Sequence, residues 1–211
     1  MFDSRSDAAA RLADALIKYR GRNPLVLGVP RGAVPMARLI ADRLGGEVDV
    51  VLVRKLGAPS NPEFAIGAVD ETGAMVLDAR NMVYSGADDS YVEMEAQHQQ
   101  ELMRKRRSQY TAQRNPIDPA GRNVIVVDDG LATGSTMMAA LQALRRHQPA
   151  RLICAVPVAP SDTVARVREY CDELVCLETP NDFYAVGQYY RYFPQVEDDE
   201  VIASLVPRAK S

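Results

Sequence analysis

Five short and nearly uninterrupted apolar runs constrain the fold of this chain more than any other feature. Strands that are apolar along their whole length are buried on both faces, which is typical of a parallel sheet covered by helices. Helical spacing of apolar residues lies between the runs, at about 7–19, 36–44, 135–147 and 161–170. The sequence therefore predicts an α/β fold whose ligands bind beyond the carboxyl ends of the strands. The runs are LVLGV (25–29), VDVVLV (48–53), VIVV (124–127), LICAVPV (152–158) and LVCL (174–177).

The middle third, about 54–120, departs from this alternation. RKLGAPSNPEFAIGAVDETGAMVL (54–77) predicts a loop followed by a hairpin that turns at Asp70–Gly73. A polar helix rich in Glu and Gln is expected at about 88–112, and NPIDPAGRN (115–123) then breaks the chain. Because no internal repeat or low-complexity segment interrupts the sequence, we expect this third to be an excursion from one domain.

Charge argues against a protein held mainly by nucleic-acid phosphates. The 211 residues include 25 basic and 28 acidic side chains, which give a net charge of −3. The basic run at 104–107 is interpreted as a solvated helix face. We therefore do not expect a nucleic-acid partner.

The chain is expected to be cytoplasmic. No apolar stretch approaches the roughly 20 residues that span a bilayer. The N-terminal sequence MFDSRSDAAARLADAL is acidic where a signal peptide is basic and then apolar. Cys154, Cys171 and Cys176 are odd in number and lack metal-binding spacing, so we expect reduced thiols buried in strands.

The motif VIVVDDGLATGST (124–136) is the most informative functional signal. A strand ends here in two carboxylates, Asp128 and Asp129, and Gly130 lets the chain turn away. Carboxylates at a strand end can accept hydrogen bonds from a ribose diol or hold a divalent cation through water. A solvated acidic loop is the alternative interpretation.

The second half of the motif opens a helix with small and hydroxyl residues. Helix N-termini present unpaired amides and partial positive charge, Thr133, Ser135 and Thr136 add hydroxyl donors, and Gly134 allows an anion close to the backbone. A plain helix cap is the alternative. A Walker A loop is excluded, because the motif has no lysine. Together the two halves predict a site for a ribose 5-phosphate.

The motif resembles the phosphoribosyl pyrophosphate (PRPP) signature of type I phosphoribosyltransferases, in the version with Ala before Thr-Gly found in adenine phosphoribosyltransferase. VPRG (29–32) is similar to the family's pyrophosphate loop, and VRKLGAP (53–59) to the start of its mobile catalytic loop. The longer stretches 54–73 and DFYAVGQYYRYF (182–193) resemble a bacterial branch described only as predicted phosphoribosyltransferases. The resemblance implies one phosphoribosyltransferase domain over 1–211, with a hood at about 178–211.

The resemblance also implies roles for individual residues. Asp128 and Asp129 would hold Mg²⁺, through water, beside the ribose and pyrophosphate oxygens. Arg31 can bind phosphate bidentately, and Arg54 and Lys55 would grip pyrophosphate under a lid formed by GAPSNPE (57–63). An ordinary turn at Arg31 and a solvated surface for Arg54, Lys55 and Glu63 are the alternatives. The expected catalytic residues are Asp129, Lys55 and Glu63. The expected substrate-binding residues are Pro30, Arg31, Gly32, Arg54, Lys55, Asp128, Asp129, Gly130, Ala132, Thr133, Gly134, Ser135, Thr136 and Phe183.

The acceptor is less defined. Ala132 stands where hypoxanthine and guanine salvage enzymes have an Asp, which argues against that specificity and leaves Glu63 or the substrate itself as the base. Phe183 and Tyr184 could stack on a planar ring, whereas the later aromatics of 182–193 could simply pack this tail. His147 is interpreted as a partner of a helix C-terminus and His98 as part of a polar helix.

The expected function is Mg²⁺-dependent transfer of ribose 5-phosphate from PRPP to a nitrogenous, nucleobase-like acceptor, in a homodimer. A PRPP-sensing regulator without turnover is the first alternative, motivated by Ala132. A hydrolase that splits PRPP or a nucleotide is the second.

Overall fold

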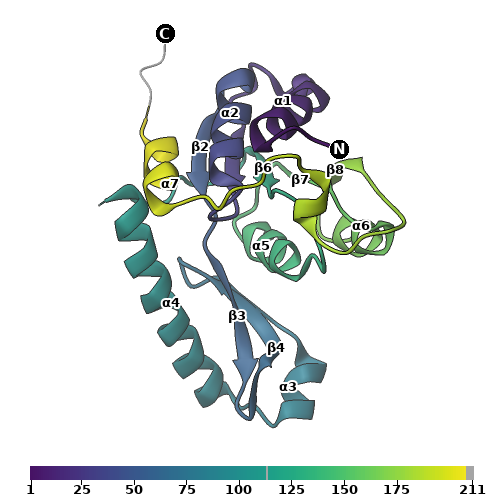
Figure 1. The fold of residues 1–211 in the computed structure, drawn as a ribbon. Helices are drawn as coiled ribbons and strands as arrows, with labels where there is room; N and C mark the ends of the chain where they lie inside the picture. Colours follow the sequence, from purple (N-terminus) through teal and green to yellow (C-terminus); the bar gives the residue numbers. More distant parts are fainter. Residues whose placement is uncertain (113, 208–211) are drawn as a thin grey trace.

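The predicted parallel sheet is present. A computed structural model describes residues 1–112 and 114–207, and its central sheet has five parallel strands in the order β2-β1-β6-β7-β8 (Figure 1). Strand order reverses between β1 and β6, because β2 lies on one side of β1 while the later strands lie on the other. The strands are β1 (Leu25–Gly28), β2 (Glu47–Val50), β6 (Asn123–Val127), β7 (Arg151–Val158) and β8 (Glu173–Glu178).

Helices cover both faces of this sheet, which explains the apolar runs. Val26, Ile125 and Ile153 belong to the cluster with α1 (Arg5–Ala15) and α2 (Val34–Leu44). Their neighbours Leu25, Val124 and Leu152 belong to the cluster with α5 (Ser135–Arg145) and α6 (Ser161–Arg168). Successive residues of a strand point to opposite faces, so both faces of the central strands meet helices.

Residues 53–111, here called the arm, extend away from the sheet (Figure 1). Three antiparallel strands, β3 (Val53–Ala58), β4 (Asn61–Asp70) and β5 (Met75–Leu77), are followed by α3 (Ala79–Ser85) and the long α4 (Asp89–Thr111). The predicted turn at Asp70–Gly73 and the polar helix are confirmed. Two expectations were wrong: the run 48–53 leaves the sheet after Val50, and the predicted loop from 54 onward is a hairpin of β3 and β4.

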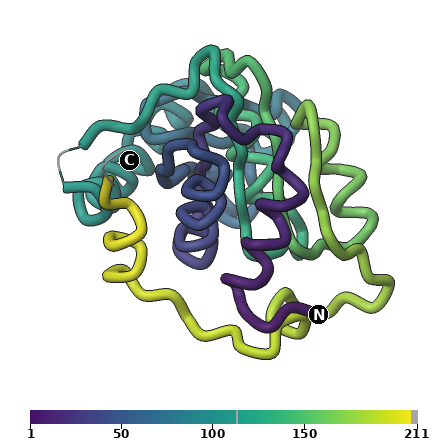
Figure 2. Tube along the Cα trace, turned by 90° about the horizontal axis from the view of Figure 1, so that it is seen from above, coloured from purple at the N-terminus to yellow at the C-terminus, as the bar shows by residue number. Residues whose placement is uncertain are grey.

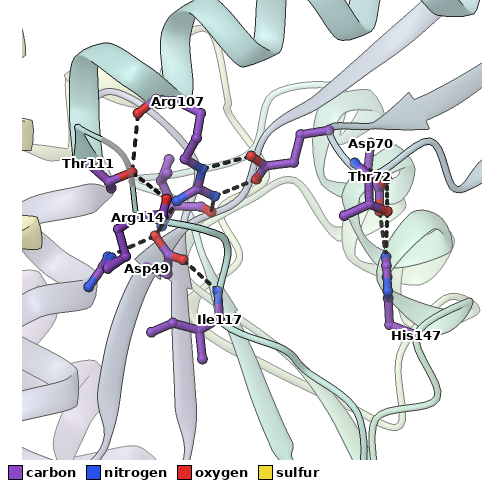
Figure 3. Close-up of polar contacts among 10 residues, drawn as sticks. Asp49, Asp70, Thr72, Arg107, Thr111, Arg114, Ile117 and His147 are labelled. Carbon is purple, nitrogen blue, oxygen red and sulfur yellow. Dashed lines mark hydrogen bonds and ion pairs between the residues drawn. The ribbon is translucent and has the colours of Figure 1, made fainter.

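A buried ion network ties the arm to the sheet (Figure 3). Arg107 of α4 donates from Nη1 to Asp49 of β2 at 2.6 Å and from Nε to Glu71 of the arm at 2.7 Å. Asp49 also accepts from Arg114 at 3.2 Å and from the amide of Ile117 at 3.0 Å. The basic run 104–107 is therefore not a uniform solvated face, because Arg107 is only 7% exposed.

Two histidines and three cysteines also have defined places. His147 lies just past α5 and its Nε2 is 2.6 Å from Asp70 Oδ2, so its main partner is a carboxylate (Figure 3). His98 is exposed on α4, as expected. The cysteines are free thiols. Cys154 is buried on β7, as expected. Cys176 lies on β8 but is only half-buried, and the half-buried Cys171 lies in the bend after α6, so the expectation of buried strand thiols was wrong for these two.

The C-terminal region returns to the start of the chain and then crosses to the arm (Figure 2). A 3₁₀ turn (Val186–Tyr189) follows β8, and the amide of Phe2 donates to Tyr189 O at 2.7 Å. The chain then runs to α7 (Asp198–Leu205), which packs beside α2 and α4. Sequence reasoning did not predict α3 or α7. Residue 113 of the expected excursion and residues 208–211 of the expected hood lie outside the described residues. Within the described ranges, no helix has both the length and the apolar character to cross a membrane.

Candidate functional site

The predicted motifs converge where the strand order reverses. Open parallel sheets bind ligands beyond the carboxyl ends of the strands at this point, because the loops of the two neighbouring strands diverge there. The loop after β1 carries VPRG, and the loop after β6 carries the acidic pair. The amide of Val29 donates to Val127 O at 2.9 Å, so the two loops start from adjacent positions.

The motif loop, residues 128–134, is held from behind by α6 and the C-terminal region. Thr163 donates its hydroxyl to Ala132 O at 2.7 Å, and Arg166 donates to Thr133 O at 3.1 Å. The hydroxyl of Tyr190 donates to Asp129 O at 2.6 Å. With these carbonyls engaged, the loop keeps its hydroxyl side available to a ligand.

The helix start has the geometry that anion binding requires. Gly134 adopts a left-handed φ of 71° as the N-cap of α5, where glycine is favoured because it lacks Cβ. A Cβ there would also lie 2.9 Å from Thr163 Cγ2. Thr133 Oγ1 and Ser135 Oγ are 3.2 Å apart at the start of the helix. The Ser135 amide donates to Thr133 Oγ1 at 3.5 Å. Among the described residues no side chain caps the amides of Thr136 and Met137, which are therefore available to an anion.

The two carboxylates of the motif differ in their partners. Asp129 forms an ion pair with Arg5 of α1, whose Nε and Nη2 are both 2.8 Å from Oδ2. Asp128 instead accepts the Asp129 amide at 2.9 Å. Burial raises the pKa of both carboxyls; the Asp129 charge raises the pKa of Asp128 further, whereas Arg5 opposes the rise in the pKa of Asp129. Ionisation of the acid pair is therefore disfavoured in the ligand-free site, and the Arg5 guanidinium offsets this in part.

The loop after β1 fits against this acid pair. The Pro30–Arg31 peptide is cis. Gly32 lies directly against the Asp129 side chain: a Cβ on Gly32 would overlap Oδ2 and lie 3.0 Å from Cγ. The amide of Ala33 is already bonded to Val29 O at 3.3 Å, so the amides of this loop that can face an anion are those of Arg31 and Gly32.

A cavity of about 530 Å³ extends from this loop toward the arm. It gathers Pro30, Arg31, Arg54, Lys55, Glu63 and Thr136 from four separate segments. Arg54 and Lys55 are exposed on β3, and within the described part of the chain the charged group of neither has an ion-pair or hydrogen-bond partner. Among the described residues that line the cavity, four cations, counting Arg106 of α4, face one acid, Glu63. A cavity of this size and charge suits a polyanionic small molecule.

Of the motif loop and the start of α5, only Thr136 lines this cavity. Other predicted binding residues border it without lining it: Gly32, Asp128, Asp129, Thr133, Gly134 and Ser135. The remaining predicted residues also lie outside it. Phe183 stacks on Tyr189 with ring centroids 5.5 Å apart, so its ring already has a partner, and Tyr184 is 88% exposed. Ala132 is exposed at the bend of the motif loop. Gly130 faces the expected hood instead, since a Cβ there would lie 2.6 Å from Val186 Cγ1. The expected lid at 57–63 is a structured hairpin tip that places Glu63 on β4.

Sequence reasoning missed several residues that complete the site. Arg5 lies 124 residues from its partner Asp129 and belongs to no motif, so no local signal marks it. Its guanidinium also stacks 3.7 Å over the Phe193 ring, which links it to the C-terminal region. Tyr190 packs the tail, as the aromatic stretch 182–193 allowed, but its hydrogen bond to the Asp129 carbonyl was not predicted. The α4 side chains that line the cavity were not predicted either, because they belong to no motif.

No preformed metal cage exists in the described residues: no three Asp, Glu, His or Cys side chains cluster there as a metal site. Mg²⁺ typically keeps several waters and uses one or two carboxylates together with substrate phosphates. Asp128 and Asp129 fit that pattern, in which the substrate completes the coordination.

Comparisons with known proteins agree with this geometry. The phosphoribosyl transferase domain model matches residues 3–194. Two proteins from Mycobacterium tuberculosis strains H37Rv and CDC 1551, each named "Putative phosphoribosyl transferase", are 44% identical over 207 residues, covering 97% of this chain and 46% of theirs. The chain spans about half the length of these curated relatives. The bifunctional protein PyrR of Chloroflexus aurantiacus is 34% identical over 131 residues, 61% of this chain and 66% of that protein.

A solved structure extends the match to the fold. The crystal structure of TT1426 from Thermus thermophilus is 48% identical, covers 97% of both chains and superimposes with a TM-score of 0.88. Because the domain model matches residues 3–194, this chain belongs to the phosphoribosyl transferase family.

Proposed function

We propose that the protein transfers ribose 5-phosphate from PRPP to a nitrogenous, nucleobase-like acceptor and releases pyrophosphate. One observation carries the proposal: the glycine of the β1 loop, Gly32, lies against Asp129 of the motif loop. This contact joins a phosphate-binding helix start and an acid pair to a cation-lined cavity. PRPP is a pentose with a phosphate at one end and a diphosphate at the other. It therefore matches a helix start for the phosphate, an acid pair for the sugar and a cation-lined cavity for the diphosphate.

Each part of PRPP has a candidate partner. The 5-phosphate binds the amides and hydroxyls of Thr133, Ser135 and Thr136 at the start of α5. Asp128 and Asp129 accept hydrogen bonds from the ribose diol. Arg31, Arg54 and Lys55 neutralise the diphosphate from the cavity.

The chemistry follows from these placements. The bond between the anomeric carbon and the diphosphate oxygen breaks, the diphosphate leaves with the electron pair, and the acceptor nitrogen forms the new bond and loses a proton. Positive charge grows on the sugar beside Asp129, and negative charge grows on the leaving group beside Lys55, so both residues stabilise the transition state. Bound Mg²⁺ would add Lewis-acid neutralisation of the leaving group. Asp128 and Asp129 would hold the ion through water, while substrate oxygens complete its shell.

The acceptor side rests on fewer contacts. The region after β8 lies over the motif loop through Val186, which leaves Ala132 and Phe183 near its edge as candidate neighbours of a planar ring. Glu63 is the candidate base. Because it shares the cavity with Lys55, it can accept a proton only from an acceptor that reaches toward the arm; otherwise the acceptor deprotonates through its own groups. We propose PRPP and a small acceptor as the partners, without nucleic acid, and a homodimer as the assembly.

A PRPP-binding regulator without turnover is the second candidate. The exposed Ala132 favours it, because no ionisable side chain stands at that position to act on an acceptor. Such a protein would bind PRPP with Mg²⁺ but release no pyrophosphate.

Pyrophosphate release distinguishes the two candidates. The protein is incubated with PRPP, Mg²⁺ and a panel of purine and pyrimidine bases, and pyrophosphate is measured with and without each base. Base-dependent release supports the transferase. Tight PRPP binding by calorimetry without release from any base supports the regulator, and release without a base indicates hydrolysis.

A further inference from the structure

The long helix of the arm contributes an unexpected face to the cavity. Besides the β1 loop and β3, the cavity is lined by Gln99, Arg106 and Tyr110 of α4. These residues belong to none of the motifs that predicted the site. Because α4 is anchored to the sheet by the buried pair of Arg107 and Asp49, the Arg106 guanidinium is held on the side where the diphosphate is proposed to bind.

The first turn of α7 supplies a carboxylate to the same cations. Asp198 accepts from Arg106 Nη1 at 3.3 Å through Oδ2 and from the Tyr110 hydroxyl at 3.3 Å through Oδ1. Arg31 Nη1 lies 3.8 Å from Asp198 Oδ1 and 3.4 Å from Glu197 Oε2. One carboxylate therefore lies between the cation of the β1 loop and the cation of α4.

The lengths and exposure of these contacts indicate that a ligand can replace the Asp198 carboxylate. All of the distances exceed those of strong charge-assisted bonds, which are about 2.7–2.9 Å. The Asp198 side chain is 43% exposed and that of Arg106 is 42% exposed, so water competes with the pair. A diphosphate offers more oxygens and more charge than this carboxylate does.

We propose that Arg106 and Tyr110 are substrate-binding residues that exchange Asp198 for the diphosphate of PRPP. The inference rests on the proposed function for the identity of the substrate. In the ligand-free protein, Asp198 occupies the donors. When the diphosphate enters the cavity, Arg31 and Arg106 clasp it from opposite sides, and α7 loses its ion pairs to the arm. The C-terminal helix is thereby coupled to occupancy of the site.

The first test removes the α4 cation. Binding of PRPP, inorganic pyrophosphate and ribose 5-phosphate, each with Mg²⁺, is measured by calorimetry for wild type and Arg106→Gln. The matched control is Lys105→Gln, which removes the same charge from an exposed neighbouring position on α4. Arg106→Gln should weaken PRPP and pyrophosphate about tenfold, as expected for one charge-assisted hydrogen bond, and leave ribose 5-phosphate unchanged. Equal affinities in Arg106→Gln and Lys105→Gln would overturn the inference.

The second test removes the competing carboxylate. Asp198→Asn should tighten pyrophosphate binding several-fold, and the gain should vanish when it is combined with Arg106→Gln. Asp199→Asn is the control, because it removes an acid from the same turn of α7 that, among the described residues, pairs with neither Arg31 nor Arg106. No gain from Asp198→Asn, or an equal gain from Asp199→Asn, would contradict the exchange.

The two proposals fail in different ways. If Arg106→Gln has the turnover of wild type and the same affinity for PRPP and pyrophosphate, the proposed role of Arg106 is refuted and the transferase proposal stands. If pyrophosphate binding depends on Arg106 but the protein transfers ribose 5-phosphate to no base, the transferase proposal is refuted and the role of Arg106 stands. A wild-type protein that binds neither PRPP nor pyrophosphate refutes both.

Discussion

Gly32→Ala tests the contact on which the site depends. The added methyl group would overlap Asp129 Oδ2, lie 3.0 Å from Asp129 Cγ and lie 3.2 Å from Arg5 Nε, where ordinary contacts begin at 3.4 Å. The carboxylate must therefore move, and its 2.8 Å contacts with Arg5 must lengthen. Overpacking of this kind costs about 1–3 kcal/mol of folding stability.

The substitution should weaken PRPP binding as well as folding. If Asp129 receives the ribose diol, its displacement removes a charge-assisted hydrogen bond worth about 1.5–3 kcal/mol, which weakens PRPP binding about 10- to 100-fold. Calorimetry gives the affinity, and urea denaturation gives the free energy of unfolding.

Gly21→Ala is the matched control for stability. Gly21 has a φ of 72°, and no atom of the described residues lies within 4 Å of the position that an added methyl group would take. The substitution therefore costs about 1–2 kcal/mol through backbone conformation alone. It should leave PRPP affinity unchanged. The reasoning is refuted if Gly32→Ala binds PRPP as tightly as wild type, or if Gly21→Ala weakens binding equally.

Three further substitutions test other parts of the account. Arg107→Met leaves Asp49 and Glu71 without their shared cation and should lower the free energy of unfolding by about 3–5 kcal/mol in urea; a loss no greater than that of the exposed Arg104→Met contradicts it. Thr163→Val removes the donor to Ala132 O, so we expect a loss of about 1–3 kcal/mol together with a higher KM for PRPP, and an unchanged KM would show that this bond does not position the loop. Burial raises the pKa of Asp172, but hydrogen bonds from Arg145 and the Leu152 amide outweigh it and hold the pKa below its ordinary value of 3.8. The stabilisation by the ionised Asp172 carboxylate is therefore complete above pH 3.8 and lost as the pH falls below it. The difference in free energy of unfolding between wild type and Asp172→Asn should shrink from about pH 7 to about pH 3. A difference that grows in acid would contradict the direction of this pKa shift.

The sheet was predictable because its signal is local. A strand covered on both faces must be apolar at every position, so each central strand is visible in the sequence by itself. The exception is informative: Val51, Leu52 and Val53 continue an apolar run but leave the sheet. They are apolar because they pass through the junction between sheet and arm, where Val51 and Leu52 are buried. The pattern of apolar residues along the sequence cannot distinguish such a buried junction from a buried strand.

The site was predictable only where its chemistry is contiguous. The acid pair, the hydroxyl cradle and the β1 loop each lie within a few residues, and strand order brings them to one edge. Arg5, Arg106 and Asp198 contribute through tertiary packing of α1, α4 and α7, and no spacing in the sequence connects them. The segment 57–63 was predicted to be a loop because small polar residues are common in loops and at hairpin tips alike. In the structure Gly57 pairs with Ala65, which makes the segment part of a hairpin.

Ribose 5-phosphate binding tests the central claim most directly, because this ligand needs only the helix start and the acid pair. Calorimetry would compare wild type with Asp129→Asn, Thr133→Val and the control Asp162→Asn, an exposed acid in the first turn of α6. The account predicts that both site variants lose about tenfold or more in affinity and that the control equals wild type. Equal affinity in all four proteins, or no binding by wild type, would contradict it.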